Sequence, residues 1–453
     1  MASRLSRRDF LRMAGSLTAG TVLAGCVAPG TVAPPAVSQE VAAAPAAERI
    51  SLRFLNKWGS GMRRELMNGF LDGWAEEHPD IGIIFEPVAD FDRRMPILVA
   101  AGEWGDIMLF FDLQLAAFHE IATDLTPFFE ATGTPFPGEE GSDLIRIPQH
   151  VGYEPGKVKA VPFQLNLVMT GINKDLFKQA GVPMPWEHDH DGDKWWDWHD
   201  YREAACAIND LGENIIGANY STPNIEQSGL VNWSVANGGQ LIDVENKKGS
   251  WNTEEFIEGQ KFAVDMICQD GCMMNVDDFQ GLGVALGMYP WVAGVQGIVA
   301  HGYLSGVHQS ESDLALVAWV RSPHTGESAG IGSMHFHIVT KQSQHPAEAF
   351  DFITYLANFE NQKNIALAGT AEPVNADVWH DAEYQETWGG PEAIEARLDA
   401  LDSFVFTPQL PGVLEWFSEI KILWGDVLRC EKTVEEQVVV VDQKTDEILA
   451  ANA

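Results

Sequence analysis

Basic residues are scarce in this chain. Its 453 residues include 29 lysines and arginines against 65 aspartates and glutamates, which gives a formal net charge of −36. Nucleic acids and anionic membrane faces are negatively charged, so a surface of this kind repels both. The sequence therefore argues against a nucleic-acid partner, although the charge says little about the fold.

The N-terminal apolar run is too short to cross a membrane. It extends from Met13 to Leu23, well below the roughly 20 residues that a spanning helix needs. The run follows the twin arginines of "SRRDFLR" (Ser6–Arg12) and precedes "LAGC", which ends at Cys26. This order is typical of a twin-arginine export signal with a lipobox. We predict that residues 1–25 are a signal peptide and that Cys26 is acylated.

The segment that follows the lipobox has almost no charged residues. Residues 26–48 are rich in Ala, Pro and Val, a composition that cannot build a core and that favours an extended, flexible tether. The folded part should therefore begin near Arg49. The remaining roughly 400 residues are enough for two domains.

Cysteine is also rare, with five residues in the chain. Acylation of Cys26 would leave Cys206, Cys268, Cys272 and Cys430, and an exported protein can form disulfides. Cys268 and Cys272 flank "QDG" at the predicted end of a helix, where their Cα atoms can come within bridging distance. We consider a Cys268–Cys272 disulfide and free, buried thiols as two alternatives. No zinc site is predicted from the cysteines, because their spacing is not CxxC.

No common catalytic motif occurs in its required context. The sequence has no HExxH or GxxxxGK[ST] motif, so no zinc-protease helix or phosphate loop is predicted. Its match to GxSxG, "GESAG" (Gly326–Gly330), comes directly before a predicted strand rather than between a strand and a helix, so no nucleophile elbow is predicted. We expect no enzyme activity and no cofactor. Composition alone does not exclude a glycosidase carboxylate pair, and a secreted glycoside-acting enzyme is therefore kept as an alternative.

From residue 50 onwards, strand patterns alternate with helix patterns. Apolar stretches at 50–55, 81–88 and 106–111 predict strands, and helical patterns separate them. Strands that alternate with helices form a parallel α/β sheet, which binds ligands in the loops after the carboxyl ends of its strands. Three side chains fall in such loops: Trp58, Phe111 and Asp112.

Two later segments are extended and apolar enough to cross between lobes. They are "KAVPFQLNLVMTGIN" (Lys159–Asn173) and "DLALVAWVR" (Asp313–Arg321). One long amphipathic helix is predicted over Pro346–Gly369, and a pair of helices is predicted at the end of the chain.

Several motifs occur in the order typical of one protein family. They are "FLDGWAEEHPDIGIIFEPV", "AAGEWGDIMLFF", "VPFQLNLVMTGINKDLFKQAGVP", "ALGMYPW" and "AGIGSMHFHIVTKQSQHPAEAFDFITYL". In this order they resemble the extracellular solute-binding proteins of carbohydrate ABC importers, the group that contains maltose-binding proteins. The similarity extends from about Ser51 to Leu449, and therefore covers nearly all of the chain after the tether.

The resemblance implies a periplasmic-binding-protein-like fold with two discontinuous α/β domains joined by a hinge. One lobe would comprise residues 49–162 and 315–369, and the other residues 163–314 and 370–453. It also implies a monomeric, lipid-anchored receptor on the outer face of the cytoplasmic membrane, or in the periplasm. Such a receptor captures a sugar or oligosaccharide and delivers it to ABC permease subunits, which depend on a separate ATPase. A non-sugar solute, such as a peptide, a polyamine or a glycerophosphodiester, is the alternative ligand.

The 15 tryptophans are more than a core of this size usually needs. Sugars present flat C–H faces and rings of hydroxyls, so a sugar site needs aromatic planes and planar polar groups. The resemblance points to Trp291, Trp416 and Trp233 as stacking residues, with a buried core position as the alternative for each. It places Asn166 as a hydroxyl binder, with Gln164 on the same face of the strand by alternation. Further candidates are Trp58, Phe111, Asp112 and Glu372.

His335 and His337 alternate along one predicted strand and could together chelate a metal. No acidic residue is adjacent to complete such a site, so we interpret them as a packed or ligand-facing pair.

The stretch "DHDGDKWWDWHD" (Asp189–Asp200) combines a helix start with alternating acids. Asp197 and Asp200 fit the N-cap and N3 positions of a helix that begins at Trp198. Asp189, Asp191 and Asp193 alternate as calcium ligands do, but glycine falls at the fourth position of the loop rather than the sixth. We therefore predict no metal site and keep calcium at these three aspartates as an alternative.

Overall fold

The computed structural model describes most of the chain from Arg49 onwards. The described residues are 49–145, 157–190, 195–220, 229–274, 290–302, 306–307, 310–388, 390–406, 408 and 410–452. The predicted signal peptide, the tether and Cys26 lie outside them. Among the described residues, no helix is both long enough and apolar enough to span a bilayer.

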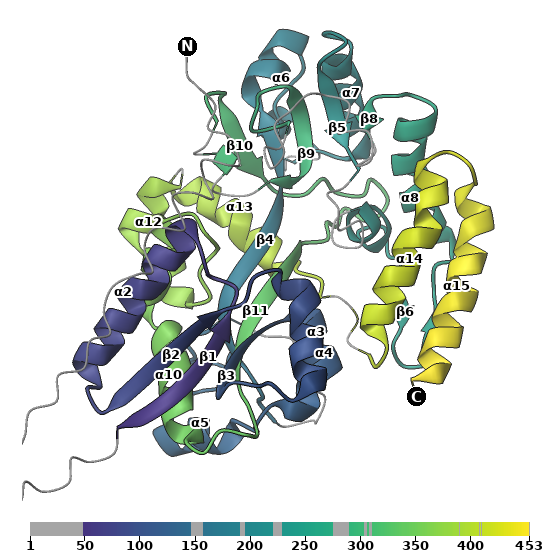
Figure 1. Cartoon of the computed structure of the whole chain (residues 1–453). Coiled ribbons are helices and arrows are strands. Elements are labelled where there is room, and N and C mark those ends of the chain that lie inside the picture. Colours follow the sequence, from purple (N-terminus) through teal and green to yellow (C-terminus); the bar gives the residue numbers. More distant parts are fainter. Residues whose placement is uncertain are drawn as a thin grey trace, which may run out of the picture. The chain divides into compact units, whose positions relative to one another are not determined.

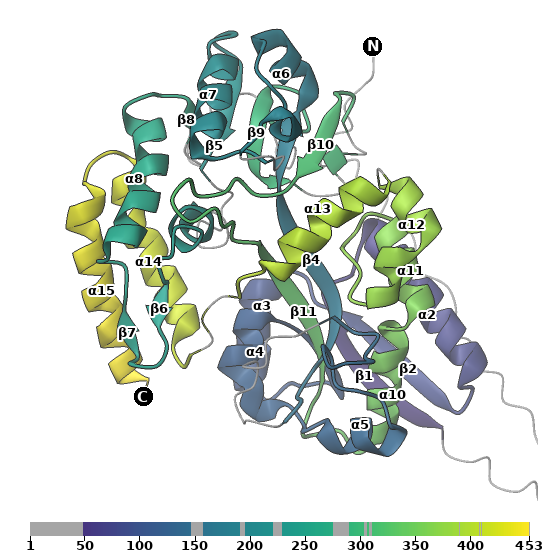
Figure 2. The ribbon, with the colours of Figure 1, turned by 180° about the vertical axis from the view of Figure 1, so that it is seen from behind.

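The first three strands form a parallel sheet, as predicted. β1 (Ile50–Asn56) pairs with β2 (Ile81–Pro87) along its whole length, and its carboxyl half pairs with β3 (Ile107–Phe111). The connecting helices, α2 (Gly61–Glu77) and α3 (Phe91–Ala101), lie on opposite sides of these strands (Figures 1 and 2). The loops that follow β1 and β3 are therefore neighbours, which is the usual position of a ligand site in an α/β sheet.

One long strand, β4 (Val161–Asn173), joins the two halves of the sheet. Its first part pairs with β11 (Ile331–Val339), and its last part pairs with β10 (Leu314–Val317) and β9 (Gln296–Gly302). Because β11 also pairs with β3, the strand order is β2-β1-β3-β11-β4-β9-β5-β8 (Figure 1). The prediction that residues 159–173 cross between the lobes is confirmed.

The second half of the sheet continues with two short parallel strands. β5 (Ile216–Asn219) lies between β9 and β8 (Met273–Met274). A separate two-stranded sheet consists of β6 (Ile242–Asp243) and β7 (Lys248–Gly249). The fold therefore combines parallel and antiparallel pairing around the shared strand β4.

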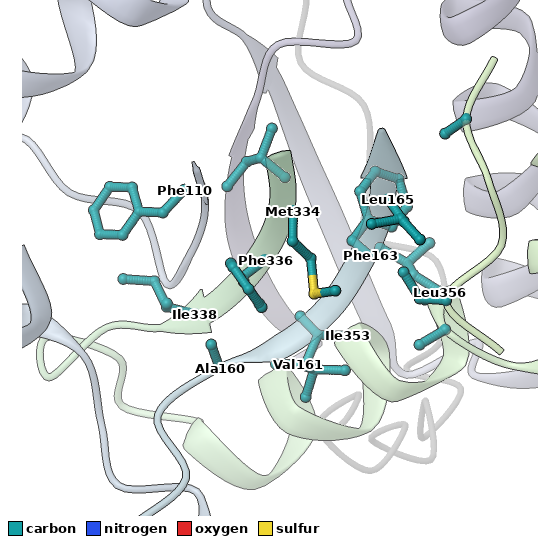
Figure 3. Packing of buried hydrophobic residues seen from close by; sticks show 14 of the residues in the cluster. Phe110, Ala160, Val161, Phe163, Leu165, Met334, Phe336, Ile338, Ile353 and Leu356 are labelled. Atoms are coloured by element: carbon teal, nitrogen blue, oxygen red, sulfur yellow. The ribbon is translucent and has the colours of Figure 1, made fainter. Parts of the chain in front are cut away.

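A first buried cluster packs against the first half of the sheet. Figure 3 shows part of it, where β4 and β11 meet the helix α10 (Pro346–Leu356). Alternation along β11 directs Met334, Phe336 and Ile338 into this cluster and leaves His335 and His337 on the other face. The two histidines therefore share one face of the strand, as predicted.

The helix predicted over 346–369 is in fact two helices. α10 ends at Leu356, and α11 (Phe359–Leu367) begins after Asn358, whose side chain accepts a hydrogen bond from the Asn361 N–H at 2.9 Å. Asparagine stabilises a helix start better than a helix interior. Asn358 therefore divides the predicted helix.

A second buried cluster packs against the other half of the sheet, and we call the two clusters the first and second cluster. Its main helices are α6 (Lys174–Ala180), α7 (Trp198–Asn209), α8 (Glu254–Cys268), α14 (Val413–Leu428) and α15 (Val434–Ala451). The N-caps of α6, α8 and α15 are Asn173, Thr253 and Thr433, whose side chains accept backbone N–H groups. The predicted helical pair at the end of the chain is confirmed.

The remaining short elements connect these layers. They are α4 (Asp112–Phe118), η1 (His119–Ile121), α5 (Thr126–Thr132), η2 (Pro185–Glu187), η3 (Val231–Val235), η5 (Ala376–His380), α12 (Ala382–Thr387) and α13 (Pro391–Asp402).

The chain changes clusters at other residues than the predicted boundaries. Trp319, Val320 and Ala329 still pack in the second cluster, so residues 313–321 are not a crossing strand and the chain returns only with β11. Residues 371–404, predicted to lie in the second lobe, pack in the first cluster instead. In this region α13 contacts β4 (Figure 2) and Glu372 pairs with Leu165 of β4, and the chain rejoins the second cluster at Leu410.

The disulfides differ from the predicted pair. Cys206 is bonded to Cys272, with Cα atoms 4.8 Å apart, and Cys268 is bonded to Cys430, at 5.8 Å. Cys268 is the last residue of α8 and faces the end of α14, whereas Cys272 precedes β8 and faces α7. The two residues that flank "QDG" therefore face different elements, and both alternatives, a Cys268–Cys272 disulfide and free thiols, are wrong.

Candidate functional site

Four strands position polar and aromatic side chains beside one another at one edge of the first sheet half. Lys57 and Trp58 follow β1, Phe111 ends β3, and Asn166 lies in β4 opposite Ser333 of β11. This edge contains five of the residues predicted from sequence: Trp58, Phe111, Asp112, Gln164 and Asn166. We call the connected set of Lys57, Trp58, Gln164, Asn166, Ser333 and His335 the polar row.

Hydrogen bonds run along the polar row from the loop after β1 to β11. Trp58 Nε1 donates to Gln164 Oε1 at 3.1 Å, and Gln164 Nε2 donates to Asn166 Oδ1 at 2.6 Å. Asn166 Nδ2 lies 3.1 Å from Ser333 Oγ and 3.3 Å from His335 Nε2. The predicted alternation of Gln164 and Asn166 on one strand face therefore brings both amides into the same network.

Lys57, Phe111 and His335 form the cationic and aromatic end of the row. Lys57 Nζ lies 3.3 Å from His335 Nε2 and 4.5 Å from the centre of the Phe111 ring, and the Phe111 and His335 ring centres are 4.3 Å apart. Burial lowers the pKa of His335 well below its ordinary value, and the charges of Lys57 and Arg63 lower it further. His335 is therefore a neutral imidazole near pH 7.

His337 lies two residues after His335 on β11, and its side chain is buried. Its Nε2 lies 3.1 Å from Asn56 Nδ2, its ring is 4.2 Å from that of Phe163, and burial lowers its pKa to about 3. Within the described part of the chain, neither His335 nor His337 belongs to a group of three residues that could hold a metal ion. The packed alternative therefore fits His337, whereas His335 belongs to the polar row.

Arg63 in the first turn of α2 adds a second cation to this edge. Its guanidinium carbon lies 5.9 Å from the Trp58 ring centre, and its Nη2 donates to Thr370 O at 3.1 Å. Burial lowers the pKa of Arg63, but a guanidinium stays charged at any physiological pH. Sequence analysis did not single out Arg63 or Lys57, although the position of Lys57 directly before Trp58 could have indicated it.

Asp112 begins α4 and is 2% exposed. Burial raises the pKa of its carboxyl to about 7, while hydrogen bonds from its own N–H and that of Leu113 act in the opposite direction. The side chain is therefore present in both protonation states near neutral pH. The carboxyl group can accept hydrogen bonds, and when it is protonated it can also donate one. It lies directly after Phe111, at the same end of β3.

The side chains of this edge differ in exposure, and that decides which of them a solute can reach. Lys57, Phe111, Asn166 and Ser333 are partly exposed, whereas Trp58, Gln164 and His335 are buried behind them. A solute would meet an ammonium group, an aromatic ring, an amide and a hydroxyl. This set suits a ligand with hydroxyl groups and a flat apolar face.

Glu372 is buried and paired inside the first cluster. Its Oε2 accepts the Tyr384 hydroxyl at 2.7 Å, Arg397 Nη1 lies 3.4 Å from the same hydroxyl, and burial raises the pKa of Glu372. Its backbone N–H donates to Leu165 O at 2.8 Å and its carbonyl accepts from Leu165 N–H at 3.3 Å, which fastens the segment to β4. These contacts favour local packing over solute contact for this residue.

Trp416, Trp233 and Trp291 all lie within buried clusters and have no exposed surface. Trp416 Nε1 donates to Thr445 Oγ1 at 2.8 Å, and its ring meets that of Trp251 edge-on. The ring of Trp233 packs against three other rings in the second cluster: Trp198, Tyr201 and Phe262. Trp291 packs with Val292, Val299 and Leu314. This burial favours the core alternative for the three tryptophans.

The start of α7 agrees with the sequence prediction. Asp197 accepts the N–H groups of His199 and Asp200, and Asp200 Oδ2 accepts the Asp197 N–H at 3.0 Å, which completes a capping box. Asp191 and Asp193 of the calcium alternative lie outside the described residues. Asp189 lies between two histidines, His188 and His190, that contact Asp200.

Known proteins share this fold. Residues 59–363 match the family described as bacterial extracellular solute-binding protein. No curated protein matches the chain. Among solved structures, the ABC substrate-binding protein Lmo0181 from Listeria monocytogenes in complex with cycloalternan has a TM-score of 0.74 and 17% identity, over 89% of this chain and 99% of that one.

Two further solved structures are similar over the same part of the chain. Maltose-bound MalE3 of T. maritima has a TM-score of 0.70 and 18% identity, over 88% of this chain and 100% of that one. UgpB from Mycobacterium tuberculosis in complex with glycerophosphocholine has a TM-score of 0.72 and 15% identity, over 88% and 98%. At such identities the likeness shows the two-lobed, periplasmic-binding-protein-like fold.

Proposed function

Since this chain belongs to the bacterial extracellular solute-binding proteins, we propose that it captures a sugar or oligosaccharide for an ABC importer. The observation that carries this proposal is the polar row with Phe111 beside it, at the strand ends of the first sheet half. Amides, a hydroxyl and an aromatic ring are what a sugar needs for its hydroxyls and its C–H face. The ligands printed for two similar structures, cycloalternan and maltose, support the same choice.

The proposed mechanism is binding and release without bond cleavage. A solute that contacts both lobes better in a closed conformation shifts the protein toward that conformation by its differential affinity. Binding-competent chains then dock on a membrane permease, whose separate ATPase drives release. The chain would work as a monomer, anchored through acylated Cys26 after a twin-arginine signal is removed.

The test is a carbohydrate panel with the purified chain that lacks its signal segment. A binding sugar should raise the melting temperature and give one site per chain by calorimetry, because a ligand stabilises the folded state in proportion to ln(1 + [L]/Kd). Asn166→Ala and Phe111→Ala should each weaken affinity by about tenfold or more. Conversion of an oligosaccharide to products would overturn the receptor proposal.

Asn68→Ala is a matched control for Asn166→Ala. Asn68 is exposed on α2 in the same lobe, so its loss should leave sugar affinity unchanged. Equal affinities of the wild type and the Asn166→Ala and Phe111→Ala variants would show that sugar binds elsewhere on the chain.

A glycerophosphodiester is a second candidate ligand, and the two cations at this edge favour it. Lys57 lies over Phe111 and Arg63 lies over Trp58, in a chain that is otherwise strongly acidic. Glycerophosphocholine in the panel tests this candidate, since UgpB is similar in fold. Lys57→Gln should then weaken phosphodiester binding and its salt dependence while leaving binding of neutral sugars nearly unchanged. No binding of glycerophosphocholine by the wild type would exclude this candidate.

A further inference from the structure

Two histidines and two aspartates converge at the start of α7, on the second lobe. His188 Nδ1 lies 3.0 Å from Asp200 Oδ1, and His190 Nε2 lies 2.8 Å from Asp200 Oδ2. The ligand atoms of His190, Asp197 and Asp200 all lie within 4.8 Å of one another. None of these four residues belongs to the polar row, so the cluster requires an explanation of its own.

The chemistry of the cluster differs from that of a calcium site. Calcium takes six to eight oxygen ligands, whereas an imidazole with two carboxylates is a mixed nitrogen and oxygen donor set that suits zinc. Two ligand atoms that each lie about 2.0–2.2 Å from one tetrahedral zinc ion are separated by about 3.3–3.6 Å. The His190–Asp200 distance, 2.8 Å, is shorter by several tenths of an ångström, so the two side chains would separate slightly to admit the ion.

Neighbouring groups hold the donors in place. Asp197 Oδ1 accepts two backbone N–H groups, those of His199 and Asp200, which orients the carboxylate. The His190 ring stacks on Trp195 with centres 4.3 Å apart, and Arg321 lies 5.2 Å from the centre of the Trp195 ring. Ligands oriented by such surroundings bind a metal more tightly than free side chains do.

The charge at the helix start also permits a cation. The N-terminus of a helix carries partial positive charge, which by itself disfavours a metal ion. Here the N-cap and N3 positions are both aspartates, and they offset that charge.

We propose that His190, Asp197 and Asp200 form a zinc-type metal site, with His188 positioning the Asp200 carboxylate, and that this site fastens the segment after η2 to the start of α7. The site is independent of the solute site, because its residues belong to a different lobe from the polar row. Zinc should therefore stabilise the protein whether or not solute is bound.

The test uses the chelator-treated chain without a histidine tag. Zinc chloride alone should bind at one ion per chain and raise the melting temperature in the absence of any sugar. Cobalt(II) should give the visible absorption of a four-coordinate site. The double variant His188→Ala/His190→Ala should lose both effects, with affinity lowered by at least 100-fold.

Two controls keep the experiment decisive. His199→Ala removes an exposed histidine from the same stretch and should bind zinc as the wild type does. The single variant His190→Gln serves if the double variant fails to fold, and it should weaken zinc binding by about tenfold or more. Wild-type protein that binds no zinc, a double variant that retains one tight zinc, or stabilisation by calcium but not zinc would each overturn the proposal.

Discussion

The two lobes are stabilised in different ways. The four cysteines of the folded part all lie in the second lobe, where two disulfides join α7 to the segment before β8 and the end of α8 to the segment after α14. The first lobe has no cysteine, and its strands are held by backbone pairing, by the buried cluster and by the polar row. The groups that we propose to contact solute therefore lie on the lobe that has no covalent cross-link.

This difference indicates that the first lobe contributes more to solute binding and the second lobe more to stability. A polar row with partly exposed amides loses some of the stability that apolar burial would supply, because buried polar groups gain little unless every partner is satisfied. The second lobe concentrates aromatic packing, as in the edge-on pair of Trp251 and Trp424. The predictions that follow test whether stability and solute binding can be changed separately in the two lobes.

The largest effect is expected from Trp416→Ala. Loss of this buried ring and of its hydrogen bond to Thr445 should lower the free energy of unfolding by about 3–5 kcal/mol, and sugar affinity should stay unchanged if Trp416 is a core residue. Urea unfolding and calorimetric titration measure the two quantities. Trp186→Ala is the control, since Trp186 is 46% exposed; loss of affinity in a folded Trp416→Ala variant would instead restore the stacking role.

The disulfide across the second lobe should have the next largest effect. Replacing Cys268 and Cys430 by Ala opens a covalent link between residues 162 positions apart and should destabilise the protein by about 2–5 kcal/mol. The Cys206→Ala/Cys272→Ala variant opens a link of 66 residues and should lose somewhat less. Scanning calorimetry should show the second lobe melting earlier while the first-lobe transition remains; an unchanged melting profile would contradict the comparison.

Asp112 should make the first lobe sensitive to pH. Its pKa of about 7 in the folded protein lies above the value of an unfolded aspartate, so the folded state holds one more proton between about pH 4 and 7. Stability should therefore fall as pH rises through this window, by at most about 1.4 kcal/mol per unit.

The Asp112→Asn variant should lose this contribution and show a flatter profile. Urea unfolding from pH 4.5 to 7.5 measures the slope, and the exposed Asp72→Asn variant should keep the wild-type slope. If Asp112→Asn has the same slope as the wild type, Asp112 is ionised throughout this range.

The smallest effect is expected at the surface pair of Arg53 and Glu86. Arg53 donates from Nε and Nη2 to the two carboxylate oxygens at 2.9 and 2.8 Å, and the Arg53 hydrogen bond lowers the pKa of Glu86. Both side chains are more than a third exposed, so Glu86→Gln should cost less than about 1 kcal/mol. The loss should shrink at high salt; a larger loss would show that surface charges help to hold the first lobe together.

Sequence patterns predicted the elements whose signals are local. Alternation and apolar runs located β1, β2, β3 and β4, and the acids at 197 and 200 located the start of α7. These features depend on residues a few positions apart, so they can be recognised without knowing the rest of the chain.

Partners that lie far apart in sequence could not be predicted in the same way. Cys268 is four residues from Cys272 but bonds to Cys430, because the end of α14 packs beside the end of α8. Trp416 resembled a stacking residue by its motif, yet its ring is enclosed by Trp251 and Thr445. Lys57 was not predicted as a site residue because its contact with His335 forms only in the folded chain. The same holds for Arg63 and its contact with the Trp58 ring.

The placement of β11 between β3 and β4 has a consequence for how the chain folds. Val339 pairs with Ile107 of β3, and Ile331 pairs with Val168 of β4. Both strands are therefore synthesised more than 150 residues before the strand that covers their edges. Contacts of such high sequence separation slow folding, and unpaired edges can associate with other chains until they are covered. A chain whose synthesis stops before residue 331 would therefore have unpaired edges on β3 and β4 that can associate with other chains. If the predicted twin-arginine signal directs export after folding, such a chain would stay inside the cell until β11 is in place.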